Sequence, residues 1–394
     1  MKTNLKNHLA AFAAIVTFAC PHISLAQQNS APPAFLAMAK KLESLKSISY
    51  NSYREINNIT DNYFAKQSAT CYIEFNQVDK LSVSRFRMEA ADYISVYNGT
   101  ESFGLSKTKK TYTLTERIDP KSFGSNSYFF NSIPTIRSVA QQIAESDTIP
   151  KHQRDTVIDG KNYKLVQVDL HRSSLQYMGS TMHFTKDVTI SYRIVIDPET
   201  WLPYQVLERN NINKDGYNTK VVFTDINTNP KQPDEYSWYY TTYLKDYQPE
   251  KQEKREPLIA TGAILLDWGL PEFGTDKQLT AADVKGKLVL LDFWIKNCGP
   301  CMESFPVLRR LQKTYGGDKF QLLSINAYDK KEEIAFFYKR EKPAYKMLYN
   351  GLSWSKGIGV SYYPTAILID KTGKVIYSGG FEHEKIEALI KANL

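Results

Sequence analysis

The sequence predicts two folded domains of different class: an N-terminal α+β domain with a curved antiparallel sheet or partial barrel and helices, and a C-terminal α/β domain. From about residue 50 to residue 247, short runs rich in Val, Ile, Tyr and Phe are separated by turn signals such as Asn98-Gly99, which is typical of antiparallel strands. After about residue 258, apolar runs of strand length alternate with helical periodicity, which is typical of a small sheet covered by helices. A chain of 394 residues is long enough to bury two cores.

The overall composition is that of a globular protein. Hydrophobic residues make up 42% of the chain and charged residues 23%, both near the averages for soluble domains. The formal net charge of +8 is spread over both halves, and no recognised nucleic-acid-binding motif accompanies it. We therefore expect a solvated basic surface and no nucleic-acid partner.

Residues 1–26 have the pattern of a secretory signal. Lys2 and Lys6 precede an apolar stretch from residue 9 to residue 19, and small residues around Ala26 mark a cleavage site. The apolar stretch is shorter than the ~20 residues that a membrane-spanning helix requires. The pattern predicts export, removal of the signal and a soluble mature chain in the periplasm or another extracytoplasmic compartment.

Cys20 offers an alternative fate for this segment, because a cysteine inside a signal can be a lipid-attachment site. Bacterial lipoprotein signals favour an aliphatic residue three places before that cysteine and a small residue two places before it, where this chain has Thr17 and Phe18. Plain signal removal is therefore preferred, and a lipid anchor at Cys20 is the alternative.

Three cysteines remain after signal removal, namely Cys71, Cys298 and Cys301. A secreted domain that depends on a disulfide framework would contain many more. Cys71 lies alone between apolar neighbours, so we expect a buried and unreactive thiol.

Residues 27–247 are predicted to form the β-rich N-terminal domain. Pro33 begins a short amphipathic helix whose apolar residues recur at helical spacing: Phe35, Met38, Leu42 and Leu45. Residues 166–170 alternate between apolar and polar, as in a half-buried strand. Residues 248–257 are mostly charged and have no apolar face, so they are predicted to be a linker.

Residues 258–394 are predicted to form the C-terminal domain. Its expected elements, in chain order, are a buried strand at 288–294, helices at 302–315 and 330–339 with a strand at 321–327 between them, an extended run after Pro364, a strand at 375–378 and a helix at 382–392.

The motif Cys298-Gly299-Pro300-Cys301 follows the expected buried strand and begins a helix. At a helix N-terminus, the unpaired backbone N–H groups and the helix dipole favour an anion, so the first cysteine is biased toward the nucleophilic thiolate. Cys301 lies nearly one turn farther into the helix and is expected to be less accessible. The pair then divides into an attacking thiol, Cys298, and a resolving thiol, Cys301.

Two alternatives remain for this motif. A C-x-x-C sequence also occurs as half of a zinc site, which needs further Cys or His ligands, and residues 258–394 contain only His383 as a candidate. The other alternative is a purely structural disulfide. We prefer the redox interpretation, which predicts no metal and no cofactor besides the redox-active disulfide.

The neighbours of the motif carry a family resemblance. The run from Leu290 to Trp294, the cysteine motif and Pro306 resemble thioredoxin, and the flanks resemble its exported TlpA/ResA-type relatives, through Gly262, Pro271-Glu272-Phe273, Leu279, Val284-Lys285-Gly286-Lys287 and Glu303. The resemblance covers essentially all of residues 258–394. It implies a thioredoxin-like fold, thiol-disulfide oxidoreductase activity on disulfide-containing protein substrates, and a membrane thiol as electron donor.

In that family a buried acidic residue helps to deprotonate the resolving thiol, and Asp292 stands in the matching place, six residues before Cys298. A carboxyl group in an apolar strand should have a raised pKa, which suits a general base near neutral pH. The alternative is an aspartate near the strand edge with ordinary solvation.

The resemblance also implies residues that face the substrate. Pro364 matches the family's cis-proline, and with Tyr363 it is expected to face the cysteines and pair with the substrate backbone. Gly299 and Pro300 are expected to face the substrate beside them. Trp294 corresponds to the family's active-site aromatic residue, with a plain core tryptophan as the alternative.

The chain departs from the family pattern directly before the first cysteine. Relatives usually have a tryptophan there, and this chain has Lys296-Asn297. We expect the Lys296 ammonium group to lower the pKa of the Cys298 thiol. The missing aromatic residue leaves partner recognition open.

Residues 33–247 resemble the LolA/LolB-type lipoprotein-carrier fold through turn and strand patterns at residues 35–45, 96–99, 109–112 and 196–203. Members of that fold enclose an apolar cavity. The resemblance therefore implies a hydrophobic ligand, with a filled core as the alternative.

The sequence thus predicts an extracytoplasmic thiol-disulfide oxidoreductase that acts mainly as a reductase. A disulfide oxidase or isomerase is the alternative within the same class. The alternative from another class is a hydrophobic-ligand or lipid-binding carrier in which the redox domain is ancillary.

Overall fold

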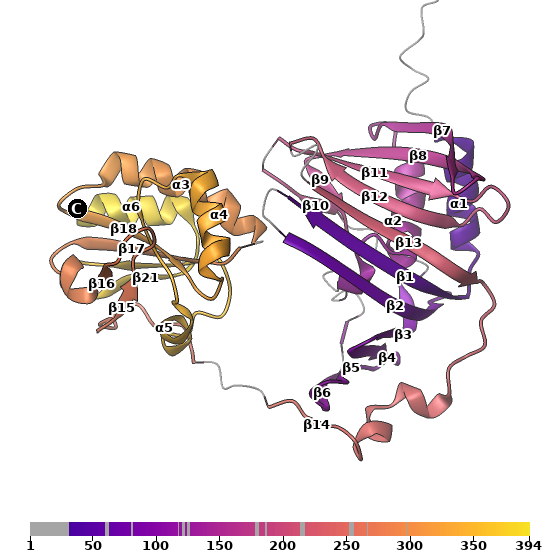
Figure 1. Cartoon of the computed structure of the whole chain (residues 1–394), viewed down its shortest axis with the longest axis horizontal. Coiled ribbons are helices and arrows are strands. Elements are labelled where there is room, and N and C mark those ends of the chain that lie inside the picture. Colours follow the sequence, from indigo (N-terminus) through magenta and orange to yellow (C-terminus); the bar gives the residue numbers. More distant parts are fainter. Residues whose placement is uncertain are drawn as a thin grey trace, which may run out of the picture.

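The computed structural model describes residues 31–59, 63–79, 82–116, 118–119, 123, 127–177, 181–185, 187–212, 217–251, 256–265, 267–296 and 298–394. Figure 1 shows two domains, and the chain leaves the first of them after β14 (Gln248–Pro249). The predicted signal with Cys20, and Asn297 near the cysteine motif, lie outside the described residues. No helix in the described part of the chain has the length and apolar character needed to span a bilayer.

The N-terminal domain is built on one large sheet. Its strands in spatial order are β14, β6 (Thr111–Glu116), β5 (Glu101–Ser106), β4 (Tyr93–Tyr97), β3 (Val83–Ala90), β2 (Tyr63–Phe75), β1 (Ser47–Asn58), β13 (Tyr217–Asn227), β12 (Pro203–Asn210), β11 (Thr189–Ile196), β8 (Lys161–His171) and β7 (Lys151–Ile158). The neighbouring strands are antiparallel, except that β14 runs parallel to β6. The sheet ends at β14 and β7, so it is open and does not form a closed barrel. The prediction of a sheet-rich N-terminal domain is confirmed.

Two helices, α1 (Pro33–Glu43) and α2 (Ile133–Glu145), pack on one face of this sheet and complete its core (Figure 1). Helix α1 confirms the predicted amphipathic helix. Helix α2 corrects the prediction of strands in its region. Two signals were missed: the Ser132 hydroxyl caps the helix by accepting a hydrogen bond from the Thr135 N–H, and buried apolar residues follow at helical spacing, namely Ile136, Val139, Ala140 and Ile143.

Residues 235–247 cover the opposite face of strands β2 to β5. They contain two 3-10 turns, η5 (Glu235–Trp238) and η6 (Tyr240–Tyr243), and the buried Trp238 ring lies 5.8 Å from the Tyr72 ring. The Gln248 and Glu250 N–H groups then donate hydrogen bonds to backbone carbonyls of β6 and the residue before it. The first residues of the segment predicted as a linker are therefore held against the sheet.

The C-terminal domain contains a five-stranded sheet in the order β19 (Lys346–Leu348), β18 (Phe320–Asn326), β17 (Leu288–Trp294), β20 (Thr365–Ile369) and β21 (Val375–Gly380). Strands β17, β18 and β19 are parallel, and β20 and β21 are antiparallel. The helices are α3 (Gly299–Tyr315), α4 (Lys331–Glu341), α5 (Leu352–Gly357) and α6 (His383–Asn393). The predicted order of elements is confirmed. Short elements were not predicted: β19, α5, the 3-10 turn η7 (Ala281–Val284) and the hairpin of β15 (Gly269–Pro271) with β16 (Gln278–Thr280).

The alternation of side chains along β17 divides the C-terminal core into two layers. The even-numbered apolar residues of β17 pack with α3, α4 and α6, and the odd-numbered ones pack with α5 and the segment before β17. Asp292 has an even number, so it lies on the face that α3 covers. This register brings one carboxyl group beneath the helix that carries the cysteines.

Candidate active site

The cysteine pair lies at the junction of β17 and α3. Cys298 is the N-cap residue of α3, and its sulfur is bonded to that of Cys301. The Cys301 N–H donates a hydrogen bond to Cys298 Sγ over 3.2 Å. Cys298 is partly exposed and Cys301 is fully buried, while Gly299 and Pro300 between them are exposed. One sulfur atom is thus open to a partner and the other is shielded.

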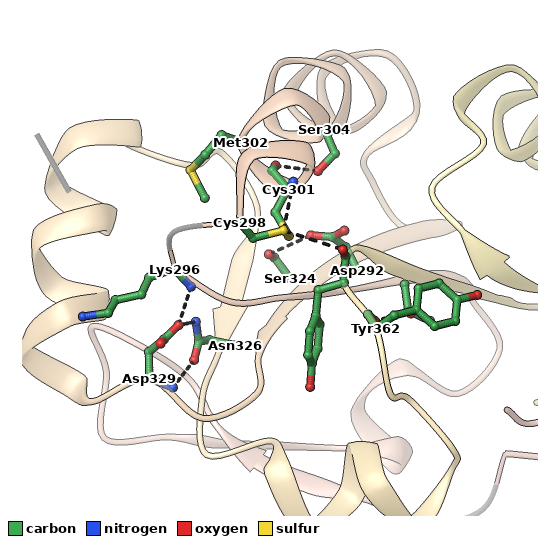
Figure 2. The surroundings of a disulfide bond; sticks show 12 residues. Asp292, Lys296, Cys298, Cys301, Met302, Ser304, Ser324, Asn326, Asp329 and Tyr362 are labelled. Carbon is green, nitrogen blue, oxygen red and sulfur yellow. Dashed lines mark hydrogen bonds between the residues drawn. A yellow bond between two sulfur atoms is a disulfide. The ribbon is translucent and has the colours of Figure 1, made fainter. Parts of the chain in front are cut away.

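Asp292 is fully buried on the sheet beneath this pair, and Figure 2 shows its carboxyl group pointing toward the disulfide. Ser324 Oγ donates a hydrogen bond to Asp292 Oδ2 over 3.2 Å, and Asp292 Oδ1 has no hydrogen-bond partner within the described residues. Burial raises the pKa of Asp292 to about 7, and the Ser324 hydrogen bond acts in the opposite direction. The alternative of an aspartate with ordinary solvation is therefore wrong.

The loop before β20 lies against the outer sulfur atom. The Tyr363–Pro364 peptide bond is cis, and the Tyr363 carbonyl oxygen lies 3.7 Å from Cys298 Sγ. Thr365 Oγ1 donates to the Tyr362 carbonyl over 2.7 Å and fixes the start of β20. The structure thus brings Tyr363 and Pro364 to the cysteines, as the family resemblance implied, and leaves both partly exposed.

Trp294 is not on the surface that a substrate can touch. Its side chain is fully buried, with its ring 5.4 Å from the Phe305 ring and 4.5 Å from the Phe337 ring. Helices α3 and α4 cover it, because Trp294 shares the face of β17 that these helices pack on. The prediction of a substrate-facing aromatic residue is therefore corrected to a core tryptophan.

Lys296 does not place its charge beside Cys298. Figure 2 shows its side chain pointing away from the disulfide, and its Nζ atom forms a salt bridge with Glu333 of α4. The same salt bridge lowers the pKa of Glu333. The Lys296 ammonium group is therefore paired with Glu333 of α4, and its expected effect on the pKa of the Cys298 thiol stays a prediction.

The backbone of Lys296 is held instead by a buried carboxylate. The Lys296 N–H donates to Asp329 Oδ2 over 2.6 Å, and Asn326 Nδ2 donates to the same oxygen over 2.7 Å. Asp329 in turn donates its own N–H to Asn326 Oδ1 over 2.9 Å. This cluster at the end of β18 fixes the chain just before the cysteine motif.

Ser324, Asn326 and Asp329 were missed in the sequence analysis. A signal for Ser324 was present, because β17 and β18 are both seven-residue strands with a polar residue at the fifth position, Asp292 in one and Ser324 in the other. If two such strands are parallel neighbours and their first residues are aligned, these two residues lie side by side. The sequence alone does not give the register of the two strands.

A cavity of about 1160 Å³ opens beside the cis-proline loop and is lined by both domains. The C-terminal domain contributes Tyr328, Val360 and Tyr363, and the N-terminal domain contributes Tyr112 and Leu114 from β6. The partly exposed face of Tyr363 therefore adjoins a space large enough for a segment of polypeptide.

The third cysteine, Cys71, lies in the N-terminal core and is a free, buried thiol, as predicted. Burial raises its pKa to about 12, so it stays protonated and unreactive near neutral pH. Among the described residues, no group of three or more His, Cys, Asp and Glu side chains is arranged to hold a metal ion.

Known proteins resemble the C-terminal part of the chain. A family model described as Redoxin matches residues 267–387. The chain is 30% identical over 140 residues to the thioredoxin-like protein YneN of Bacillus subtilis, a match that covers 34% of this chain and 81% of YneN. It is 30% identical over 133 residues to the thiol-disulfide oxidoreductase ResA of Geobacillus thermodenitrificans, covering 33% of this chain and 75% of ResA.

Solved structures resemble it as well. The thioredoxin domain of a thiol-disulfide oxidoreductase from Bacteroides vulgatus is 20% identical with a TM-score of 0.30, covering 34% of this chain and 99% of that one. A thiol:disulfide interchange protein from a Bacteroides species is 20% identical with a TM-score of 0.31, covering 34% of this chain and 91% of that one.

The Redoxin match contains β17, the cysteine pair, α3 and the cis-proline loop that were described above. The matches to YneN and ResA each cover more than two thirds of the relative at 30% identity. Through its C-terminal domain, the chain therefore belongs to the thioredoxin-like thiol-disulfide oxidoreductases of the TlpA/ResA type.

Proposed function

We propose that the chain is an extracytoplasmic thiol-disulfide oxidoreductase that reduces disulfide bonds in protein substrates through Cys298 and Cys301. The observation that carries the proposal is the unequal placement of the two sulfur atoms. Cys298 is partly exposed at the N-terminus of α3, and Cys301 is fully buried. This is the arrangement that an attacking thiol and a resolving thiol require.

In the first step, the Cys298 thiolate attacks one sulfur atom of the substrate disulfide. The bond between the two substrate sulfurs breaks, one of them leaves as a thiolate that takes up a proton, and a mixed disulfide with Cys298 remains. The helix dipole of α3 and the Cys301 N–H stabilise the negative charge on Cys298 before the attack. The exposed Gly299 and Pro300 leave room for the partner.

In the second step, Cys301 transfers its proton to Asp292 and attacks Cys298 Sγ. The mixed disulfide breaks, the substrate sulfur leaves and takes up a proton, and the Cys298–Cys301 disulfide forms. Two electrons have then passed from the cysteine pair to the substrate. A pKa of about 7 lets Asp292 accept and release a proton near neutral pH.

The Tyr363–Pro364 loop is proposed to bind the substrate backbone beside Cys298. Its support is the short distance between the Tyr363 carbonyl and Cys298 Sγ, and the adjoining cavity. No cofactor besides the disulfide enters this scheme. A thiol donor must return two electrons and two protons to the pair after each turnover, and the family resemblance implies a donor in the membrane.

The extracytoplasmic location rests on the signal pattern of residues 1–26. Cell fractionation of the full chain and of a form without these residues tests it. A Cys20→Ala variant that leaves the membrane fraction, while the full chain stays in it, would support a lipid anchor instead of plain signal removal.

The redox potential of the Cys298–Cys301 pair tests the direction of electron flow. A reductase should have a potential near that of thioredoxin, about −270 mV, and an oxidase near that of DsbA, about −120 mV. A value close to the second would contradict the reductase proposal. Cys298→Ser, which removes the attacking sulfur, is the control for the assignment of the signal.

A further inference from the structure

Ser324 faces the carboxyl group of Asp292 from the neighbouring strand. The two residues are direct partners in the parallel register of β17 and β18, and both side chains are fully buried. Because they share one face of the sheet, the Ser324 hydroxyl reaches Asp292 Oδ2 over 3.2 Å. It is the one hydrogen-bond donor to this carboxyl group within the described residues.

Among the described residues, burial and the Ser324 hydrogen bond are the influences on the pKa of Asp292, and no positive charge is among them. Strand β20 places Ala366 opposite Asp292, and α3 contributes the sulfur atoms of the cysteine pair. Tyr345, just before β19, interacts electrostatically with Asp292. Burial raises the pKa of Tyr345, with the Asp292 charge acting in the same direction, so Tyr345 is neutral over the working range of pH.

We propose that Ser324 is a positioning residue that favours the ionised form of Asp292 and thereby sets the pH at which Cys301 is deprotonated to resolve the mixed disulfide. The inference rests on the proposed function, because it concerns the second step of that scheme. Ser324 touches neither the substrate nor a sulfur atom in this role. It acts through the carboxylate that accepts the Cys301 proton.

The physical reason is the difference between two hydrogen bonds. A hydroxyl group that donates to an ionised carboxylate makes a charge-assisted bond, which is roughly twice as strong as a bond to a neutral acceptor. The hydroxyl therefore favours the ionised form and opposes the effect of burial. Its removal should raise the pKa of Asp292 by about 0.5 to 1 pH unit, so the ionised fraction at pH 7 falls about two- to five-fold.

The test follows the resolving step in the full chain. The Cys298 thiol is loaded with 5-thio-2-nitrobenzoate as a mixed disulfide, and the release of this chromophore by Cys301 is followed by stopped flow from pH 5 to pH 9. For Ser324→Ala we expect the midpoint of the pH profile to rise by about 0.5 to 1 pH unit and the rate at pH 7 to fall about two- to five-fold. Ser324→Thr keeps the hydroxyl group and should restore the midpoint.

A double-mutant cycle separates this role from a structural one. In an Asp292→Asn background the Ser324→Ala change should leave the pH profile unmoved, because the group on which Ser324 acts is gone. Ser304→Ala is the matched control, since Ser304 is also buried but donates to the Cys301 carbonyl on α3. It should not move the midpoint.

An unchanged midpoint in Ser324→Ala, or a shift of equal size in the Asp292→Asn background, would overturn the inference. If Ser324→Ala does not fold, two other measurements test the proposed role of Ser324: the pH profile of Ser324→Thr, and a ¹³C NMR titration of the Asp292 carboxyl group in the unmodified chain. A carboxyl pKa near 4 in that titration would also overturn the inference. Failure of the proposed function gives a different result. In that case Cys301 does not release the chromophore at any pH, or the redox potential is oxidising.

Discussion

Replacing Asp292 by Asn should stabilise the C-terminal domain at high pH and leave its stability unchanged at low pH. The pKa of Asp292 is raised from 3.8 to about 7 in the folded chain because the carboxyl group is buried. Each pKa unit corresponds to about 1.36 kcal/mol, so the ionised carboxylate costs the folded state about 4 kcal/mol.

The pH window of this effect follows from the two pKa values. Below about pH 4, Asp292 is protonated in both the folded and the unfolded state and carries no such cost. Between about pH 4 and pH 7, the unfolded state ionises while the folded state stays protonated, so the free energy of unfolding falls as the pH rises. Above about pH 7 the loss is complete. Asn carries no proton equilibrium, so the Asp292→Asn variant should lack this decline.

Native-state hydrogen exchange of the β17 and β18 amides in the oxidised protein measures this difference, since whole-chain unfolding would mix the two domains. The variant should gain up to about 4 kcal/mol in opening free energy between pH 4 and pH 8. Amides of β1 and β2 in the N-terminal domain are the internal control and should not change. A gain of the same size at every pH, or lower protection of the variant at pH 8, would refute the reasoning.

Three further predictions concern residues around the cysteine pair. Cys301→Ser should accumulate a mixed disulfide with a substrate on non-reducing gels, whereas Cys298→Ser should form none; an adduct in the second variant would contradict the assignment of the two thiols. Asp329→Ala should speed hydrogen exchange at the Lys296 amide, because hydrogen bonds to charged groups contribute about 1.5–3 kcal/mol each. The matched control Glu333→Gln loses one surface ion pair of about 0–1 kcal/mol and should have a smaller effect. Equal effects of the two changes would show that the ion pair holds the loop. Trp294→Ala should destabilise the domain by about 3–5 kcal/mol, and Trp294→Phe should leave the substrate KM unchanged; a raised KM at unchanged stability would make the ring a substrate contact.

Strand and helix order in the C-terminal domain was predictable because its periodicity is regular and its elements are long. Strand β17 could be placed from its apolar run, and the burial of Asp292 followed from its apolar neighbours. Trp294 has the same kind of neighbours, yet its role could not be read from them. The pattern gives the face on which a side chain lies, and only the packing of α3 and α4 shows that this face is closed.

Most of the site features that the sequence did not predict depend on contacts between elements that are distant in the sequence. Ser324 lies 32 residues from Asp292, and their pairing depends on the register of two strands that a helix separates. Lys296 shows the same limit, because a charge next to a cysteine in the sequence is turned toward Glu333 by the position of α4. Helix α2 is a different case, since its local signals were present in the sequence and were outweighed by the surrounding strand pattern.

The burial of Asp292 affects both the stability of the C-terminal domain and the proposed resolving step, and it acts on the two in opposite directions. The burial that raises the pKa of Asp292 to about 7 suits the proposed role of this residue as a base near neutral pH, and the same burial makes its ionised form costly for the fold. Ser324 relieves part of that cost by stabilising the carboxylate. A variant that removes the charge should therefore be more stable at pH 8 and slower in the resolving step, whereas one that removes only the Ser324 hydroxyl should be slower at pH 7 without that gain.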